Sequence, residues 1–124
     1  MEVILVVDDD RIVLEVLKRI LERERIETHC VSSGEEAVEQ IKKKNYSLMI
    51  TDLCMPGMDG FELTRKVLEI APQMPVIMDT GSISPKIIRM AKEIGISEVL
   101  AKPFHIKELL NTVREVLRTG REYA

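Results

Sequence analysis

Three carboxylates, one hydroxyl and one amine stand at the ends of short apolar runs in this sequence. Asp8 and Asp9 follow the first run, Asp52 ends another, and Thr80 and Lys102 end two later ones. Two carboxylates about 4 Å apart repel each other by roughly 4 kcal/mol at an effective dielectric constant near 20. If the three acids converge, a carboxyl pKa must rise or a cation must lie among them. Lys102 can offset one charge, and Mg²⁺, which prefers oxygen ligands, would offset more.

The order of the elements predicts that these groups do converge. Apolar runs of strand length alternate with apolar residues at helical spacing along the chain. We expect strands at residues 3–7, 28–31, 47–52, 75–80 and 99–101, and helices over residues 13–21, 33–41, 61–70, 84–94 and 106–117. Strands that are apolar throughout are typical of a parallel sheet covered on both faces. The fold class is therefore α/β, a doubly wound five-stranded parallel sheet with five helices. Right-handed crossovers leave few topologies for such a sheet, and among them we expect the flavodoxin-like order 2-1-3-4-5.

In such a sheet, ligands bind beyond the carboxyl ends of the strands. The five polar side chains named above would share that edge, which makes it the candidate site. Asp10 is expected to be an ordinary loop residue, and Asp59 a helix N-cap without a chemical role.

Composition excludes several classes of protein. The chain has 124 residues, with 45% hydrophobic and 31% charged residues and a net charge of −3. We expect one domain over residues 1–120 and a short tail at 121–124. The negative charge argues against nucleic-acid binding, and no apolar stretch approaches the roughly 20 residues of a membrane span. Cys30 and Cys54 lack metal-ligand spacing, which favours a reducing, cytoplasmic setting.

Four segments together resemble the receiver domain of bacterial two-component response regulators. They occur in the order of that family, and the resemblance covers residues 2–118. The segments are Val6-Val7-Asp8-Asp9, Thr51-Asp52-Leu53-Cys54-Met55-Pro56-Gly57-Met58-Asp59-Gly60, Asp79-Thr80-Gly81 and Ala101-Lys102-Pro103-Phe104. The second segment is the most specific of the four.

The resemblance implies that Asp52 accepts a phosphoryl group from a phosphohistidine on a histidine kinase or phosphotransfer protein. Asp8 and Asp9 would bind Mg²⁺ together with Asp52 and the backbone carbonyl of Cys54. Such a domain is not an enzyme in the usual sense, because it catalyses only its own phosphorylation and a slow autodephosphorylation. Phosphorylation would switch the surface of the fourth and fifth helices for binding a partner protein.

The resemblance also assigns roles to the ends of the last two strands. Lys102 would pair with the phosphoryl oxygens, and the hydroxyl of Thr80 would move onto one of them as the trigger of the switch. The bond between Lys102 and Pro103 is typically cis in the family, which X-Pro bonds permit.

Two positions depart from the family pattern. Val99 stands where the family commonly has an aromatic residue that swings inward, so the aromatic half of the switch is missing. Asp79 stands where the residue is usually apolar. Because side chains alternate along a strand, Asp79 and Thr80 point to opposite faces, and we expect Asp79 to face away from the phosphoryl group.

Dephosphorylation in the family is tuned two residues after the phosphoacceptor and two after the threonine. Cys54 and Ser82 occupy these places and neither orients an attacking water well. We therefore expect the phosphoryl group to be lost slowly, over minutes or longer.

Three other functions use parts of this pattern. A Mg²⁺-dependent phosphatase with an aspartate nucleophile needs a second acid where Cys54 stands, and a flavodoxin-like cofactor binder needs a phosphate loop where the three consecutive aspartates stand. A degenerate receiver would be a docking module that works without phosphorylation.

The face of the fourth and fifth helices is the expected contact surface, and a homodimer across it is a further option. Its expected basic residues are Lys86, Arg89, Lys92, Lys107 and Arg114. The chain is either a stand-alone receiver or part of a longer regulator.

Overall fold

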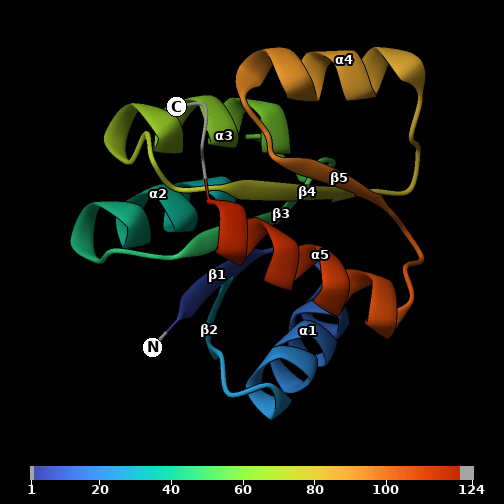
Figure 1. Ribbon diagram of the computed structural model, residues 1–124. Helices are drawn as coiled ribbons and strands as arrows, with labels where there is room; N and C mark the ends of the chain where they lie inside the picture. Colours follow the sequence, from blue (N-terminus) through green and yellow to red (C-terminus); the bar gives the residue numbers. More distant parts are fainter. Residues whose placement is uncertain (1, 121–124) are drawn as a thin grey trace.

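The computed structural model describes residues 2–120, and in this range five strands alternate with five helices (Figure 1). The strands are β1 (Val3–Val7), β2 (Glu27–Val31), β3 (Leu48–Asp52), β4 (Val76–Thr80) and β5 (Glu98–Ala101). The helices are α1 (Arg11–Arg23), α2 (Gly34–Lys43), α3 (Gly60–Ile70), α4 (Pro85–Ile94) and α5 (Ile106–Thr119). The tail expected at residues 121–124 lies outside the described residues.

The strands form one parallel sheet in the order β2-β1-β3-β4-β5. Helices α1 and α5 cover one face of the sheet, and α2, α3 and α4 cover the other (Figure 1). The predicted fold class and strand order are confirmed. Parallel strands need crossover connections, and a helix in each connection supplies the cover that the two apolar faces require.

Alternation along the strands divides the apolar side chains between two cores. Ile4 and Val6 of β1, Ile50 of β3 and Ile77 of β4 belong to the core beneath α1 and α5. Leu5, Val7, Met49 and Met78 are among those that pack beneath α2, α3 and α4. Position along a strand therefore fixes which face a side chain joins, and the same rule holds for the polar residues where the strands end.

Polar residues set the starts of the helices next to that edge of the sheet. Asp10, Ser33, Asp59 and Ser84 each accept a hydrogen bond from a backbone N–H in the first turn of the following helix. Pro85 occupies the first turn of α4, where its missing N–H is not needed. The capping role expected for Asp59 is thus confirmed. Within residues 2–120, none of the helices has the length and apolar character needed to span a bilayer.

Candidate phosphoryl and cation site

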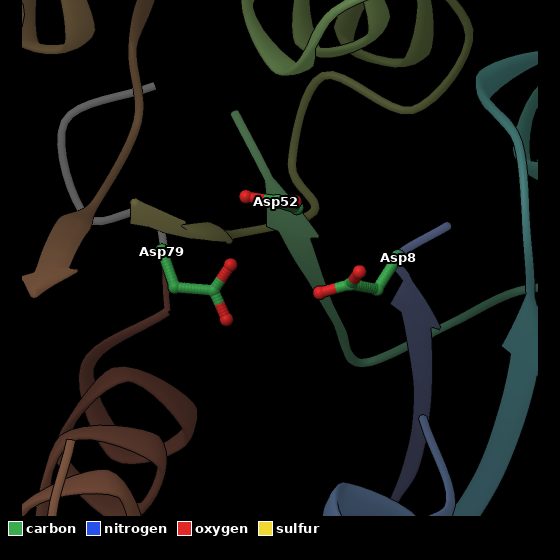
Figure 2. Close-up of side chains that lie close together, drawn as sticks. All are labelled: Asp8, Asp52 and Asp79. Atoms are coloured by element: carbon green, nitrogen blue, oxygen red, sulfur yellow. The ribbon is translucent and has the colours of Figure 1, made fainter. Parts of the chain in front are cut away.

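The strand register places three aspartates side by side where β1, β3 and β4 end. Asp52 pairs with Asp79 across β3 and β4, and Val7 pairs with Thr51 across β1 and β3, so Asp8 follows next to Asp52. Figure 2 shows the carboxylates of Asp8 and Asp79 pointing toward each other, with Asp52 between them. One carboxylate oxygen from each residue lies within 4.8 Å of the other two.

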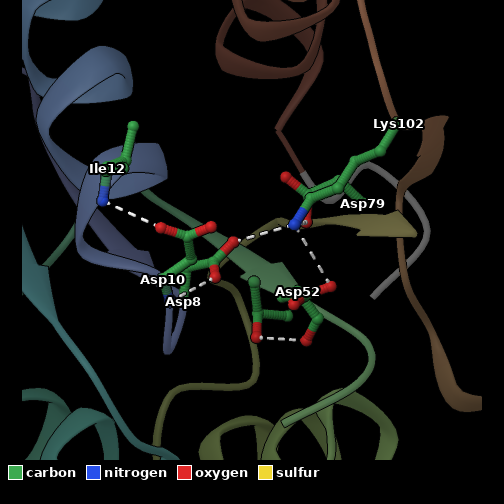
Figure 3. Close-up of polar contacts among 7 residues, drawn as sticks. Asp8, Asp10, Ile12, Asp52, Asp79 and Lys102 are labelled. Atoms are coloured by element: carbon green, nitrogen blue, oxygen red, sulfur yellow. Dashed lines mark hydrogen bonds and ion pairs between the residues drawn. The ribbon is translucent and has the colours of Figure 1, made fainter. Parts of the chain in front are cut away.

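Lys102, just after β5, brings an ammonium group into this cluster. Its Nζ lies 2.9 Å from Oδ2 of Asp8, 3.5 Å from Oδ1 of Asp52 and 3.9 Å from Oδ1 of Asp79 (Figure 3). The contact with Asp8 has hydrogen-bond length. The peptide bond between Lys102 and Pro103 is cis, as the resemblance implies. We call Asp8, Asp52, Asp79 and Lys102 the acidic pocket.

The orientation expected for Asp79 is wrong. Asp79 and Thr80 do point to opposite faces, but Asp52 shares the face of Asp79, because the two are register partners. The sequence argument compared Asp79 with its neighbour Thr80 and left out its partner on β3. Asp52 follows Ile50 and Asp79 follows Ile77 by two residues, and the structure places both isoleucines in the core beneath α1 and α5.

Burial raises the pKa of Asp79 to about 7, aided by the charges of Asp52 and Asp8 and opposed by Lys102. Only 1% of Asp79 is exposed, and its Oδ1 has no hydrogen-bond partner among the described residues. Burial also raises the pKa of Asp52, again with a contribution from Asp8 and against the attraction of Lys102. Both shifts reflect carboxylates removed from water with too little positive charge beside them.

The pKa of Lys102 moves in the opposite sense from that of an isolated buried amine. Burial alone would lower it, but the hydrogen bond to Asp8 and the charges of Asp79, Asp8 and Asp52 raise it overall. The ammonium of Lys102 is therefore positively charged and partly neutralises the acidic pocket. When all three carboxylates are ionised, the one ammonium leaves two negative charges uncompensated.

Asp8 is held by two hydrogen bonds and is almost fully buried. One carboxylate oxygen accepts from the backbone N–H of Asp10 at 2.9 Å, and the other accepts from Lys102. Asp10 in turn caps α1, its Oδ1 accepting from the N–H of Ile12 at 2.9 Å (Figure 3). Asp10 is exposed, as expected of a loop residue, but its role as the N-cap of α1 was not predicted. Asp9 is exposed and lies outside the cluster formed by the three aspartates.

The other residues named from the sequence surround the acidic pocket in different ways. Thr80 is buried, and its Oγ1 accepts a hydrogen bond from the backbone N–H of Ser82 at 3.2 Å. Val99 is half-buried and packs against the core beneath α2, α3 and α4. The side chain of Cys54 is exposed.

Gly60 shows how tightly the backbone of Asp52 is held. A Cβ at Gly60 would lie 2.5 Å from the backbone oxygen of Asp52 and 2.9 Å from the Cα of Leu53. The N–H of Gly60 donates to the carbonyl of Leu53 at 2.8 Å. The start of α3 therefore packs directly on the end of β3, and only glycine permits this approach.

The acidic pocket suits a hard divalent cation. Its carboxylate oxygens are the ligand type that Mg²⁺ and Ca²⁺ prefer. Two negative charges lack a counter-charge when all three acids are ionised, and within residues 2–120 no hydrogen-bond partner reaches the buried Oδ1 of Asp79. The backbone carbonyl of Cys54 and the exposed carboxylate of Asp9 are the further donors that the sequence predicts.

Comparison with known sequences points to one family. The model of the response regulator receiver domain matches residues 4–114. The heme response regulator HssR of Staphylococcus epidermidis is 40% identical over 114 residues, which cover 92% of this chain and 50% of HssR. The response regulator receiver protein CpdR of Brucella abortus is 32% identical over 117 residues, which cover 94% of this chain and 98% of CpdR. The chain thus spans about half the length of HssR and nearly all of CpdR.

Solved structures agree with the sequence comparison. A CheY-like response regulator receiver domain protein from Methanospirillum hungatei has a TM-score of 0.92 and 31% identity, covering 98% of this chain and 97% of that chain. The chemotaxis protein CheY4 of Vibrio cholerae has a TM-score of 0.90 and 30% identity, covering 94% of this chain and 98% of that chain. The fold of this chain is thus shared with solved receiver domain proteins.

Proposed function

Because the chain belongs to the family of response regulator receiver domains, we propose that it is switched by phosphorylation of Asp52. The observation that carries this proposal is the convergence of Asp52, Asp8 and Lys102 at the carboxyl end of the sheet. These residues supply a nucleophile, a cation ligand and a counter-charge in one place, which a degenerate docking module would not need.

The proposed reaction is the transfer of a phosphoryl group from a phosphohistidine to Asp52. A carboxylate oxygen of Asp52 forms a bond to phosphorus while the bond from phosphorus to the histidine nitrogen breaks, and the imidazole leaves with the electron pair of that bond. A carboxylate is a known nucleophile in covalent catalysis. Phosphoryl transfer requires mainly positioning and charge stabilisation from the protein, and Lys102 supplies a positive charge 3.5 Å from Asp52.

Mg²⁺ is the cation that we propose for this site, held by Asp8, Asp9, Asp52 and the backbone carbonyl of Cys54. When bound, it would neutralise charge on the transferring phosphoryl group. Asp8 is already fixed by its hydrogen bond from the N–H of Asp10, so one ligand is oriented before any ion arrives. Cys54 gives no second acid, which disfavours the phosphatase alternative.

The proposed output runs from Thr80 to the loop before α4. The hydroxyl of Thr80 accepts from the N–H of Ser82, so its movement toward a phosphoryl oxygen would release that contact and shift the loop. Val99 has no ring to follow this motion, so the change should be centred on the loop and α4. Phosphorylation would then shift an existing equilibrium between two states of this surface.

The proposed partners are a histidine kinase or phosphotransfer protein as donor and a protein that binds the face of α4 and α5, with a homodimer across that face as the alternative. The residues predicted for this face, namely Lys86, Arg89, Lys92, Lys107 and Arg114, are all exposed. Arg114, however, forms an ion pair with Glu24, just after α1, so its charge is turned toward α1. A cytoplasmic location and the boundary of the domain at residue 120 remain part of the proposal.

Beryllofluoride, which mimics a phosphoryl group, tests the switch directly. In the presence of Mg²⁺ we expect it to move the backbone amide resonances of residues 81–101, because these follow Thr80. Asp52→Asn is the matched control, since it removes the acceptor charge and keeps the side-chain shape, and its resonances should not move. Resonances of residues 81–101 that stay unchanged in the wild type would contradict the proposal.

A further inference from the structure

Asp79 is the member of the acidic pocket for which the proposed reaction has no task. Asp8 accepts two hydrogen bonds, and Asp52 is the proposed acceptor. The side chain of Asp79 is 2% exposed, and its Oδ1 has no hydrogen-bond partner among the described residues. Figure 2 shows that it points into the pocket, toward Asp8. A buried carboxylate oxygen left in this state is unfavourable unless something else comes to it.

The position of Lys102 shows what Asp79 does when no ligand is bound. The ammonium lies 3.9 Å from Oδ1 of Asp79, farther than a hydrogen bond but close enough for a strong charge interaction. Asp79 attracts the same ammonium that a phosphoryl group on Asp52 would require. The two demands compete, because Lys102 carries one charge and has three carboxylates around it.

The two ligands of the proposed function respond to Asp79 in opposite ways. A divalent cation is attracted by every negative charge in the pocket, so Asp79 favours it. A phosphoryl group brings a charge of about −2 in place of the single charge of Asp52, so Asp79 repels it. Asp79 also attracts the Lys102 ammonium, which weakens the pairing of that ammonium with the phosphoryl oxygens. The same carboxylate therefore strengthens the binding of the divalent cation and weakens the binding of the phosphoryl group.

We propose that Asp79 sets the balance between the two ligands of the acidic pocket, favouring the divalent cation and opposing the phosphoryl group. This inference rests on the proposed function, and it adds Asp79 to that function as a positioning residue. The unphosphorylated, cation-loaded protein is thereby favoured, and the phosphorylated state is populated only when the supply of phosphoryl donor is strong. Asp79 acts through its charge on both ligands and through its hold on Lys102.

The test compares wild type with Asp79→Asn at pH 8 in two titrations followed by NMR. In the first, Mg²⁺ is added alone, and the variant should bind it about tenfold more weakly because one anionic neighbour is lost. In the second, beryllofluoride is added at saturating Mg²⁺, and the variant should bind it about tenfold more tightly because the repulsion is gone. Opposite signs are the signature, since a merely structural change would weaken both.

Asp9→Asn is the matched comparison, because Asp9 is a proposed cation ligand outside the cluster of the three buried aspartates. This variant should lose affinity for both Mg²⁺ and beryllofluoride. If wild type binds both ligands and Asp79→Asn shifts the two affinities in the same direction, or shifts neither, the inference about Asp79 is overturned and the proposed function stands. If wild type binds neither ligand, the proposed function and this inference both fail.

Discussion

Asp79→Asn should stabilise the folded protein by about 4 kcal/mol at pH 8 and by about 2 kcal/mol at pH 5. The cause is the burial of Asp79 beside Asp52 and Asp8, which raises its pKa from an ordinary 3.8 to about 7. Asparagine keeps the shape of the side chain and removes the charge that is costly to bury. The effect should be largest where Asp79 would otherwise be ionised.

The direction of the pH dependence follows from proton binding. Between pH 4 and pH 7 the folded state holds a proton on Asp79 that the unfolded state has released, so the stability of the wild type falls as the pH rises. Above about pH 7 both states are ionised, and the loss stays constant. Asparagine does not titrate, so the variant lacks this slope.

Urea denaturation at pH 5 and pH 8 in metal-free buffer measures the difference. Asp9→Asn removes an exposed carboxylate nearby and is the control, which should follow the wild type at both pH values. If Asp79→Asn raised the free energy of unfolding equally at pH 5 and pH 8, the raised pKa of Asp79 would be contradicted.

Lys102→Met should lower the free energy of unfolding by about 3 kcal/mol at pH 8 in metal-free buffer. Methionine keeps the length of the side chain but removes the cation from three carboxylates. Asp8 is affected most, because it is 1% exposed and loses a hydrogen bond of 2.9 Å. Removing one partner of a buried ion pair leaves an uncompensated charge, which is far more costly than losing an exposed pair.

Addition of Mg²⁺ separates this explanation from a loss of packing. A divalent cation can replace the missing ammonium, so Mg²⁺ should stabilise Lys102→Met more than the wild type. Lys107→Met is the control, since Lys107 is exposed on α5 and its removal should change stability by less than about 0.5 kcal/mol. Equal losses from the two lysine variants, with no rescue by Mg²⁺, would contradict the assigned role of Lys102.

The fold could be predicted from the sequence because each local signal agreed with the next. The apolar run of residues 3–7 and the helical stripe that follows Asp10 appear in the structure as β1 and α1. Ser33 and Ser84 cap helices at the residues where the sequence places them. Parallel strands end at one edge of the sheet, so the meeting of Asp8, Asp52 and Lys102 followed from the strand ends alone.

The orientation of Asp79 could not be obtained in the same way. Alternation relates a residue to its neighbours on one strand, whereas the face that it shares with Asp52 depends on the register between β3 and β4. The register is set by packing of the two cores, which no single segment of sequence reveals. The pairing of Arg114 with Glu24 is likewise a contact between residues distant in sequence, and helical spacing on α5 does not predict it.

The most direct test of the account is to identify where the chain takes up a phosphoryl group. Wild type and Asp52→Asn are incubated with acetyl phosphate and Mg²⁺, and the intact proteins and their peptides are weighed by mass spectrometry. We predict one added phosphoryl group on the peptide that contains Asp52 in the wild type, and none in the variant. An unlabelled wild type, or a label that persists in Asp52→Asn, would contradict the assignment of Asp52 as the phosphoacceptor.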